Sequence, residues 1–234
     1  MVSLFHFKEE IVSKLTFDPA LVAVESIPGE PAIHTERLTP DWIRNRFSTP
    51  PHWEPEIRVE LPVVPRREDW VPASVLIPIV ARTDGPTLLL TKRADHLYHH
   101  GGQISFPGGR ADEEDASRVA TALRELEEEV GLHRRHVEVV GTLPDYHTGT
   151  GFCVTPVVSI VQPPFELQTD PFEVAEAFEV PLSFLMNGTH HQIRTADFPN
   201  GLGRRTYYSM QYEQYFIWGA TAGILRNLFH FLRA

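Results

Sequence analysis

The chain of 234 residues is long enough for one large domain or for a core domain with an extension, and its hydrophobic fraction of 42% is ordinary for a globular protein. A formal net charge of −10 argues against nucleic acid or an anionic membrane as a non-specific partner. No apolar run reaches the roughly 20 residues of a membrane span, and no secretory or lipidation signal is recognisable. Because the single cysteine, Cys153, cannot form an internal disulfide, we expect a cytoplasmic protein.

Residues 1–70 are rich in proline and poor in long periodic segments, which predicts an irregular extension of short helices and extended pieces. One helix is expected over 39–47, since Thr39 can act as its N-cap and Pro40 suits the first helical position. The extension could cover a site, form a homodimer contact or do neither. We therefore divide the chain into an N-terminal extension and a second domain, residues 71–234.

Short runs rich in Val, Ile and Leu begin after residue 70 and predict β-strands. They span residues 73–82, 87–93, 137–143 and 154–161. Helical periodicity is present over 115–130 and in the closing segment, residues 220–234. This mixture of strands and few helices predicts an α+β domain in which helices are layered on a sheet.

The helix expected over 115–130 separates its charged and apolar residues. Four apolar residues spaced 4, 3 and 4 positions apart form one narrow stripe for a core: Val119, Leu123, Leu126 and Val130. Glu128 and Glu129 follow Glu125 by 3 and 4 positions, so these three carboxylates share another face. Like charges at such spacing cost about 0.2 to 0.5 kcal/mol per pair, and anions are unfavourable near a helix C-terminus. A divalent cation bound by the carboxylates would reverse this cost.

The simpler interpretation of these glutamates is a solvated face with incidental charge. The segment that precedes the helix favours a site instead. Gly108 and Gly109 follow Pro107, and glycine allows positive φ and close approach of the backbone to a ligand. Magnesium binds through a few carboxylates together with water and substrate phosphates. The loop and the helix together predict a cradle for a metal-bound diphosphate.

Residues 109–132 resemble the Nudix box, a pattern of Gly, Glu, Arg-Glu, an aliphatic residue, Glu-Glu, Gly and an aliphatic residue at fixed spacing. The matching residues are Gly109, Arg124, Glu125, Leu126, Glu128, Glu129, Gly131 and Leu132. Two features depart from the pattern: Asp115 replaces its first Glu, and the spacing from there to Arg124 is one residue longer. The resemblance implies a Nudix-type α/β/α sandwich with a mixed central sheet.

The segment upstream of the box resembles the extended motif of coenzyme A diphosphatases, a subfamily that commonly shows the same Asp and the same longer spacing. The residues in step are Leu89, Leu90, Thr91, Arg93, Ala94, Gly102, Phe106, Pro107, Gly108, Gly109 and Asp112. Later segments, 148–161, 173–185 and 212–228, resemble its remaining parts, so the likeness covers the chain from Val71 onward. Tyr98 stands where the motif usually has Arg.

The resemblance implies metal-dependent hydrolysis of the diphosphate bond of coenzyme A or its derivatives, a small-molecule substrate. The products would be adenosine 3′,5′-bisphosphate and 4′-phosphopantetheine, and the cofactor Mg²⁺ or Mn²⁺. Two alternatives stay open. One is a Nudix hydrolase of another nucleoside diphosphate derivative, such as ADP-ribose, a dinucleotide or an oxidised nucleotide. The other is a non-catalytic nucleotide-binding sensor.

The metal would be bound by Glu125, Glu128 and Glu129. The i, i+4 spacing aligns Glu125 and Glu129 best, which leaves Glu128 as a ligand or a base. Like charges raise the pKa of a carboxyl group, so Glu125 or Glu128 could take a proton from water. Nudix enzymes often draw a further carboxylate from the region of a late strand, and Glu173 is the candidate there.

The remaining candidates each have a structural alternative. Lys92 and Arg93 could hold phosphates or be ordinary edge-strand charges. Asp115 could contact metal or cap the helix, and Arg124 could position glutamates or lie on the surface. Phe106, Gly108 and Gly109 are expected to contact the substrate through the resemblance. His99 and His100 could donate hydrogen bonds near the site but are not expected to bind metal, and His190 with His191 is expected to be a loop feature. The aromatics Tyr215, Phe216 and Trp218 are expected in the core and not as a platform for adenine.

Overall fold

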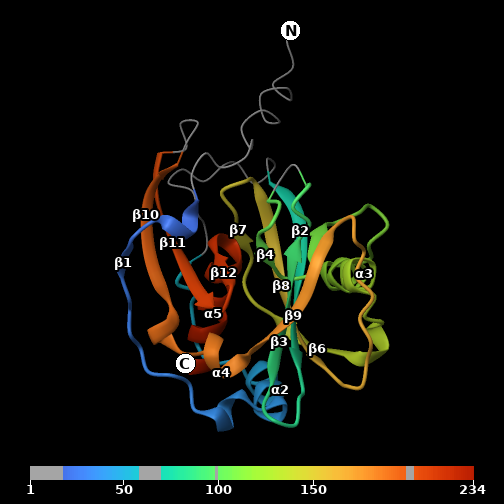
Figure 1. Ribbon diagram of the computed structural model, residues 1–234. Helices are drawn as coiled ribbons and strands as arrows, with labels where there is room; N and C mark the ends of the chain where they lie inside the picture. Colours follow the sequence, from blue (N-terminus) through green and yellow to red (C-terminus); the bar gives the residue numbers. More distant parts are fainter. Residues whose placement is uncertain (1–17, 58–69, 98–99, 199–202) are drawn as a thin grey trace.

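The structure, a computed structural model, describes residues 18–57, 70–97, 100–198 and 203–234. Two β-sheets form its framework (Figure 1). The larger sheet follows the order β4-β3-β2-β8-β6, while β5 pairs with β2, β7 with β8 and β9 with β3. Its strands are β2 (Val71–Val80), β3 (Thr87–Arg93), β4 (Ile104–Ser105), β5 (Gly108–Arg110), β6 (Val137–Thr142), β7 (Tyr146–His147), β8 (Phe152–Val161) and β9 (Val174–Pro181).

The larger sheet is mixed, as predicted. β2 and β8 are parallel along their whole length, whereas β2 pairs with β3 and β5, and β8 with β6 and β7, in antiparallel fashion. The four strands predicted from the sequence correspond to β2, β3, β6 and β8, with ends shifted by no more than two residues. Local runs of branched apolar residues were therefore sufficient to locate the centre of the sheet.

A second, four-stranded sheet was not predicted. Its antiparallel strands are β1 (Val24–Ser26), β10 (Gln192–Phe198), β11 (Gly203–Tyr212) and β12 (Tyr215–Trp218), in that order. This sheet places a strand of the N-terminal extension beside strands that come late in the chain (Figure 1).

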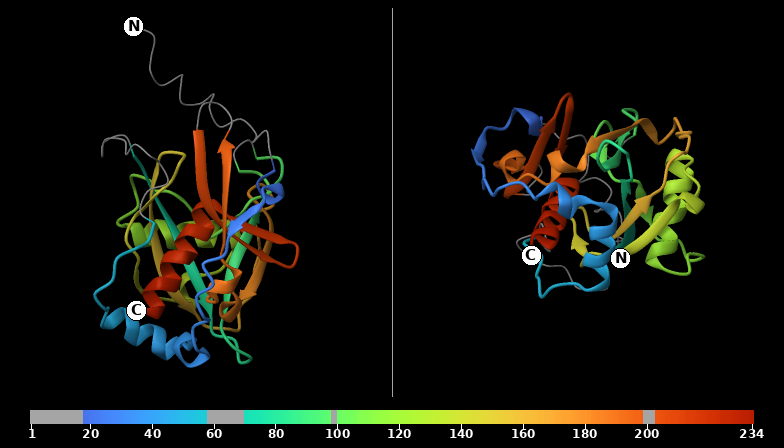
Figure 2. Two further views of the ribbon diagram at one scale, coloured as in Figure 1. Left: turned by 90° about the vertical axis from the view of Figure 1, so that its left-hand side faces the viewer. Right: turned by 90° about the horizontal axis from the view of Figure 1, so that it is seen from below.

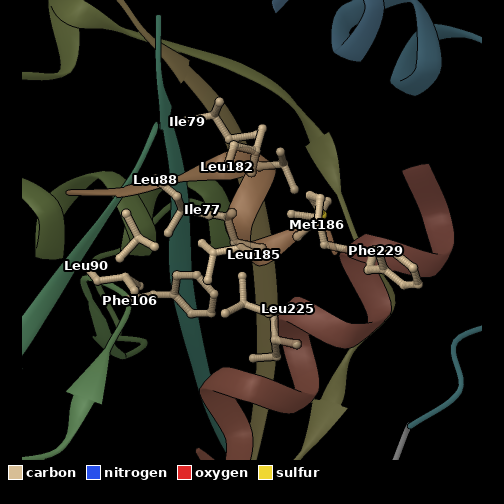
Figure 3. Packing of buried hydrophobic residues seen from close by; sticks show 14 of the residues in the cluster. Ile77, Ile79, Leu88, Leu90, Phe106, Leu182, Leu185, Met186, Leu225 and Phe229 are labelled. Carbon is tan, nitrogen blue, oxygen red and sulfur yellow. The ribbon is translucent and has the colours of Figure 1, made fainter. Parts of the chain in front are cut away.

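Helices cover both faces of the larger sheet. α3 (Arg118–Val130) packs on one face, and α5 (Gly219–Arg233) lies on the other face, between the two sheets (Figures 1 and 2). The α3-side cluster contains Leu76, Val80, Leu89, Leu126 and Val130 among others. The α5-side cluster contains Ile77, Ile79, Leu88, Leu90, Phe106, Leu225 and Phe229 among others (Figure 3). The arrangement confirms the predicted α+β fold with helices layered on a mixed sheet.

α3 begins at Arg118, later than the periodic pattern suggested. Ser117 is its N-cap, because the hydroxyl of Ser117 accepts a hydrogen bond of 3.1 Å from the N–H of Ala120. Asp115 lies before the helix, so its predicted alternative role as a cap is wrong. Gly131 ends the helix in the left-handed conformation, with φ of 67°.

The described part of the N-terminal extension packs against the second domain. α2 (Pro40–Ser48) has the predicted cap, since the hydroxyl of Thr39 accepts a hydrogen bond from the N–H of Trp42. Ile33, Leu38 and Ile43 are buried in the α5-side cluster. The remaining short helices are η1 (Pro19–Leu21), η2 (Thr35–Leu38), η4 (Arg134–His136), α4 (Leu182–Leu185) and η5 (Gly188–His190). The two parts of the chain share one core, and the division into two domains at residue 70 stays a prediction.

Arg226 of α5 ties this extension to the rest of the molecule. Its buried guanidinium donates to both Glu30 and Glu56 and lies 3.1 Å from Nδ1 of His191. The side-chain amide of Asn227 also accepts a hydrogen bond from the N–H of Ile57 and donates one to its backbone oxygen. Across the described ranges, no helix combines the length and apolarity that crossing a membrane would require.

Candidate functional site

The three glutamates predicted as metal ligands differ in burial although they share one face of α3. The side chain of Glu128 is 59% exposed, whereas that of Glu129 is only 2% exposed. Glu125 lies between these extremes and is largely buried. The helix thus presents one carboxylate to solvent and turns two toward the loop that contains Gly108 and Gly109.

Arg124 holds the acidic groups at the start and middle of this face. Its Nη1 lies 2.9 Å from Oε1 of Glu125 and 2.8 Å from Oε2 of Glu128. Its Nε and Nη2 donate to the two carboxylate oxygens of Asp115, at 3.1 and 2.9 Å. These bonds hold the pKa of Asp115 well below its usual range and raise that of Arg124. The predicted salt-bridging role of Arg124 is confirmed.

Glu129 is a buried carboxylate with little compensation for its charge. Its Oε2 accepts a hydrogen bond of 3.3 Å from the N–H of Gly108, and its Oε1 lies 3.6 Å from Nη1 of Arg93. Burial raises the pKa of Glu129 to about 8, with Glu125 adding to the rise and Arg93 opposing it. A carboxylate held in this way is stabilised by any further cation that reaches it.

Gly108 and Gly109 bring the loop into close contact with the sheet and with α3. A Cβ atom at Gly109 would lie 2.5 Å from Oε1 of Glu125, and one at Gly108 would lie 2.4 Å from the backbone oxygen of Ser74. Gly108 therefore requires glycine, because a Cβ atom there would overlap backbone atoms, whereas a Cβ atom at Gly109 would displace only the end of the Glu125 side chain. Burial raises the pKa of Glu125, with Arg124 opposing the rise.

Glu173 lies at the entry to β9, beside the end of β3. Its backbone oxygen accepts a hydrogen bond of 2.9 Å from the N–H of Ala94, and its side chain is exposed. The charge of Glu173 contributes to the raised pKa of both Glu125 and Glu129. The structure therefore places Glu173 close enough to the α3 glutamates to interact electrostatically with them. The spacing of these residues in the sequence does not predict this proximity.

The other acidic residues of β9 are engaged elsewhere. Glu176 accepts a hydrogen bond of 2.6 Å from the hydroxyl of Tyr215, and Glu179 pairs with Arg82 at 2.6 Å. Of the three glutamates in this region, Glu173 alone is thus placed with the α3 carboxylates. Tyr215 is buried and stacks on Phe178, as expected for a core aromatic.

Two predicted substrate contacts do not face the α3 glutamates. Phe106 is only 3% exposed and packs beside Leu90 and Leu225 in the α5-side cluster (Figure 3). Apolar neighbours surround its side chain, so this position favours a structural role, and the substrate contact expected of Phe106 stays a prediction. Lys92 lies on β3 next to Arg93, but strand alternation directs successive side chains to opposite faces. Arg93 takes the face of Glu129, and Lys92 takes the other.

The histidines of the two pairs that the structure describes have hydrogen-bond partners elsewhere in the chain. Tyr98 and His99 lie outside the described residues. Nδ1 of His100 lies 2.9 Å from Oε1 of Gln103, and His191 is buried with Nε2 2.8 Å from the backbone oxygen of Leu185.

The carboxylates fit a divalent cation by their chemistry. Within the described ranges, no three acidic, histidine or cysteine side chains already converge as a complete cage, and Arg124 bridges two of the glutamates. Magnesium does not need such a cage, because it uses one or two carboxylates with water and substrate phosphates. Glu125 and Glu129 supply hard oxygen donors whose burial disfavours an uncompensated negative charge. These residues are therefore suited to a cation of this class.

The family model described as the NUDIX domain matches residues 70–195, more than half of the chain. The chain belongs to the Nudix family. It is also similar to two curated proteins, from Escherichia coli strain K12 and Shigella boydii serotype 18, each named "Uncharacterized Nudix hydrolase NudL". Each is 48% identical over 157 residues, which cover 67% of this chain and 80% of the relative.

Solved structures of Nudix proteins overlap parts of the chain. A Nudix hydrolase from M. smegmatis, RenU, is 23% identical with a TM-score of 0.42, covering 48% of this chain and 71% of that one. A MutT/nudix family protein from Enterococcus faecalis is 14% identical with a TM-score of 0.43, covering 70% of this chain and 63% of that one.

As a Nudix hydrolase, the protein cleaves a phosphoric anhydride bond in a nucleoside diphosphate derivative, a small-molecule nucleotide. Nudix hydrolases generally use divalent metal ions. The sequence did not predict several contacts that organise this Nudix site. Asp112 lies 3.5 Å from Nη2 of Arg124, and the backbone oxygen of Arg110 accepts from the same nitrogen at 3.1 Å. The contact between Arg93 and Glu129 was also missed, because no local spacing relates a strand residue to a helix so far along the chain.

Proposed function

We propose that this Nudix hydrolase cleaves the diphosphate bond of coenzyme A or its derivatives and releases adenosine 3′,5′-bisphosphate and 4′-phosphopantetheine. One observation carries the proposal. Arg93 and Gly108, both from the segment that resembles coenzyme A diphosphatases, meet Glu129 of the Nudix box at a single buried carboxylate. The upstream motif and the box are therefore parts of one site.

Glu125, Glu128 and Glu129 are the proposed ligands of Mg²⁺ or Mn²⁺. Such a cation would neutralise charge on the diphosphate oxygens and lower the pKa of a bound water. Arg93 lies beside Glu129, where its guanidinium can donate to a phosphate oxygen. Arg124 fixes the carboxylates of Glu125 and Glu128 through bonds of 2.9 and 2.8 Å, which keeps them oriented for binding.

Glu173 is the proposed general base. Its carboxylate is exposed, so water can reach it, and its charge acts on both buried glutamates. A base in this position would accept a proton from the attacking water. Gly109 keeps that loop close to Glu125, since a Cβ atom there would overlap the carboxylate.

Product analysis tests this proposal. The purified chain is incubated with coenzyme A and Mg²⁺ or Mn²⁺, in parallel with ADP-ribose, a dinucleotide and nucleoside triphosphates. We expect 4′-phosphopantetheine and adenosine 3′,5′-bisphosphate to be released from coenzyme A with the highest kcat/KM, and chelator to abolish the release. Preferred cleavage of another compound would contradict the coenzyme A assignment and keep the Nudix chemistry.

A further inference from the structure

β3 ends in two cations that serve different faces of the larger sheet. Leu89 belongs to the α3-side cluster, whereas Leu88 and Leu90 belong to the α5-side cluster (Figure 3). Continuing this alternation, Arg93 falls on the α3 side, where it contacts Glu129, and Lys92 falls on the α5 side. Their Cα atoms are about 3.8 Å apart, but their charged ends point away from each other.

The strands beside Lys92 identify its face independently. Lys92 pairs with Ile104 of β4 and with Glu176 of β9. Ile104 is buried in the α5-side cluster, and Glu176 accepts a hydrogen bond from the hydroxyl of Tyr215 in β12, which belongs to the same cluster. Cross-strand partners share a face of the sheet. The ammonium group of Lys92 therefore extends toward β12, away from the α3 glutamates.

Lys92 is half-buried, and its ammonium group has no charged partner among the residues that the structure describes. No hydrogen bond or ion pair of its ammonium group is present there, and its neighbour Glu176 is bonded to Tyr215 instead. Ordering a long side chain beside a core without a partner costs free energy. A ligand with an anionic group at this face would recover that cost.

We infer that Lys92 binds a third phosphate of the substrate, separate from the diphosphate that Arg93 and the glutamates handle. A diphosphate at the α3 side cannot also reach a cation on the opposite face of β3. A nucleotide whose ribose carries its own phosphate can engage both, with the strand end between the two anionic groups. The inference rests on the proposed function, since coenzyme A has such a ribose 3′-phosphate, and it makes Lys92 a residue that selects substrates bearing one.

Kinetics with a matched pair of substrates test the inference. We expect the unaltered protein to prefer coenzyme A over dephospho-coenzyme A, which lacks only the ribose phosphate. In Lys92→Met, kcat/KM for coenzyme A should fall on the order of tenfold to hundredfold, the range for one charge-assisted hydrogen bond, while that for dephospho-coenzyme A stays unchanged. Lys92→Arg should retain the preference, and Arg135→Met, a charge loss at the exposed η4, should alter neither value.

Binding of the product fragment gives a second readout. Calorimetry should show that Lys92→Met weakens the binding of adenosine 3′,5′-bisphosphate but not the binding of AMP. If Lys92→Met leaves the ratio of kcat/KM for coenzyme A to that for dephospho-coenzyme A unchanged, the inference is overturned and the proposed function stands. If the unaltered protein cleaves neither coenzyme A compound, the proposed function fails and the inference fails with it.

Discussion

Gly109 and the carboxylate of Glu125 approach so closely that no side chain fits between them: a Cβ atom at residue 109 would lie 2.5 Å from Oε1 of Glu125. The atoms that would be displaced belong to the end of a side chain, which can move without breaking the fold. We therefore expect Gly109→Ala to lower kcat about a hundredfold through misplacement of Glu125, with the free energy of unfolding changed by less than about 1 kcal/mol.

The neighbouring glycine is the matched control. A Cβ atom at Gly108 would lie 2.4 Å from the backbone oxygen of Ser74, which cannot move aside. Gly108→Ala should therefore destabilise the fold by about 1–3 kcal/mol in urea unfolding. Full activity in Gly109→Ala would show that the exact position of the Glu125 carboxylate does not matter.

The stability of the metal-free protein should depend on pH through Glu129. Its pKa is raised in the folded state from an ordinary 4.5 to about 8, so between these values the folded protein holds a proton that the unfolded chain releases. Stability is therefore greatest below pH 4.5 as far as this group is concerned, and falls as pH rises toward 8. The whole change is on the order of 3 to 5 kcal/mol. Urea unfolding with chelator, at several pH values, measures it.

Glu129→Gln isolates this contribution. Glutamine copies the shape of the neutral carboxyl group and does not titrate, so the variant should lose the Glu129 part of the pH dependence. It should also be more stable than the unaltered protein at pH 8 without metal. Identical pH dependence of both proteins would contradict the burial of an uncompensated carboxylate at this position.

If Glu173 is the general base, its replacement should lower the rate of turnover without weakening substrate binding. Glu173→Gln should lower kcat on the order of 10² to 10⁴, because proton transfer is lost, with KM changed little. Glu166→Gln is the control, since Glu166 is an exposed carboxylate of the loop that leads to β9. Steady-state kinetics of the two variants separate a specific role from a general effect of charge. Equal and small effects would remove Glu173 from the mechanism.

The N-terminal extension should unfold together with the Nudix domain. Ile43 of α2 is completely buried in the α5-side cluster, so Ile43→Ala should cost about 2–5 kcal/mol. Leu21, also in the extension, is 84% exposed, and Leu21→Ala should change stability by less than about 0.5 kcal/mol. A single urea transition shifted only by Ile43→Ala is expected. A separate transition for the extension would contradict a shared core.

Local patterns predicted the parts of the site that depend on spacing within one element. The stripe that includes Leu126 and the glutamate face of α3 follow from 3.6 residues per turn, and the bridge from Arg124 to Glu128 spans one turn. Which glutamate is buried could not be predicted. Glu129 is covered because β3 and the glycine loop close over it, and that packing is decided by distant segments.

Long-range pairing explains what else the sequence did not reveal. In the sequence, Arg226 is a charged residue within a largely apolar helix and has no evident partner. In the structure its partners are Glu30 and Glu56 of the extension. The second sheet likewise joins β1 to β10, which no local periodicity relates. Phe106 matched a family motif, yet its place in the core was fixed by α5.

The most direct test of a metal-dependent diphosphatase site on α3 is the turnover of coenzyme A by Glu125→Gln at saturating Mg²⁺, measured as release of 4′-phosphopantetheine. Glutamine keeps the size of the side chain, so circular dichroism and the unfolding midpoint should match the unaltered protein. We predict a loss of turnover on the order of 10³ or more, since a metal ligand and its charge are removed together. Turnover equal to that of the unaltered protein, from a correctly folded variant, would contradict the account.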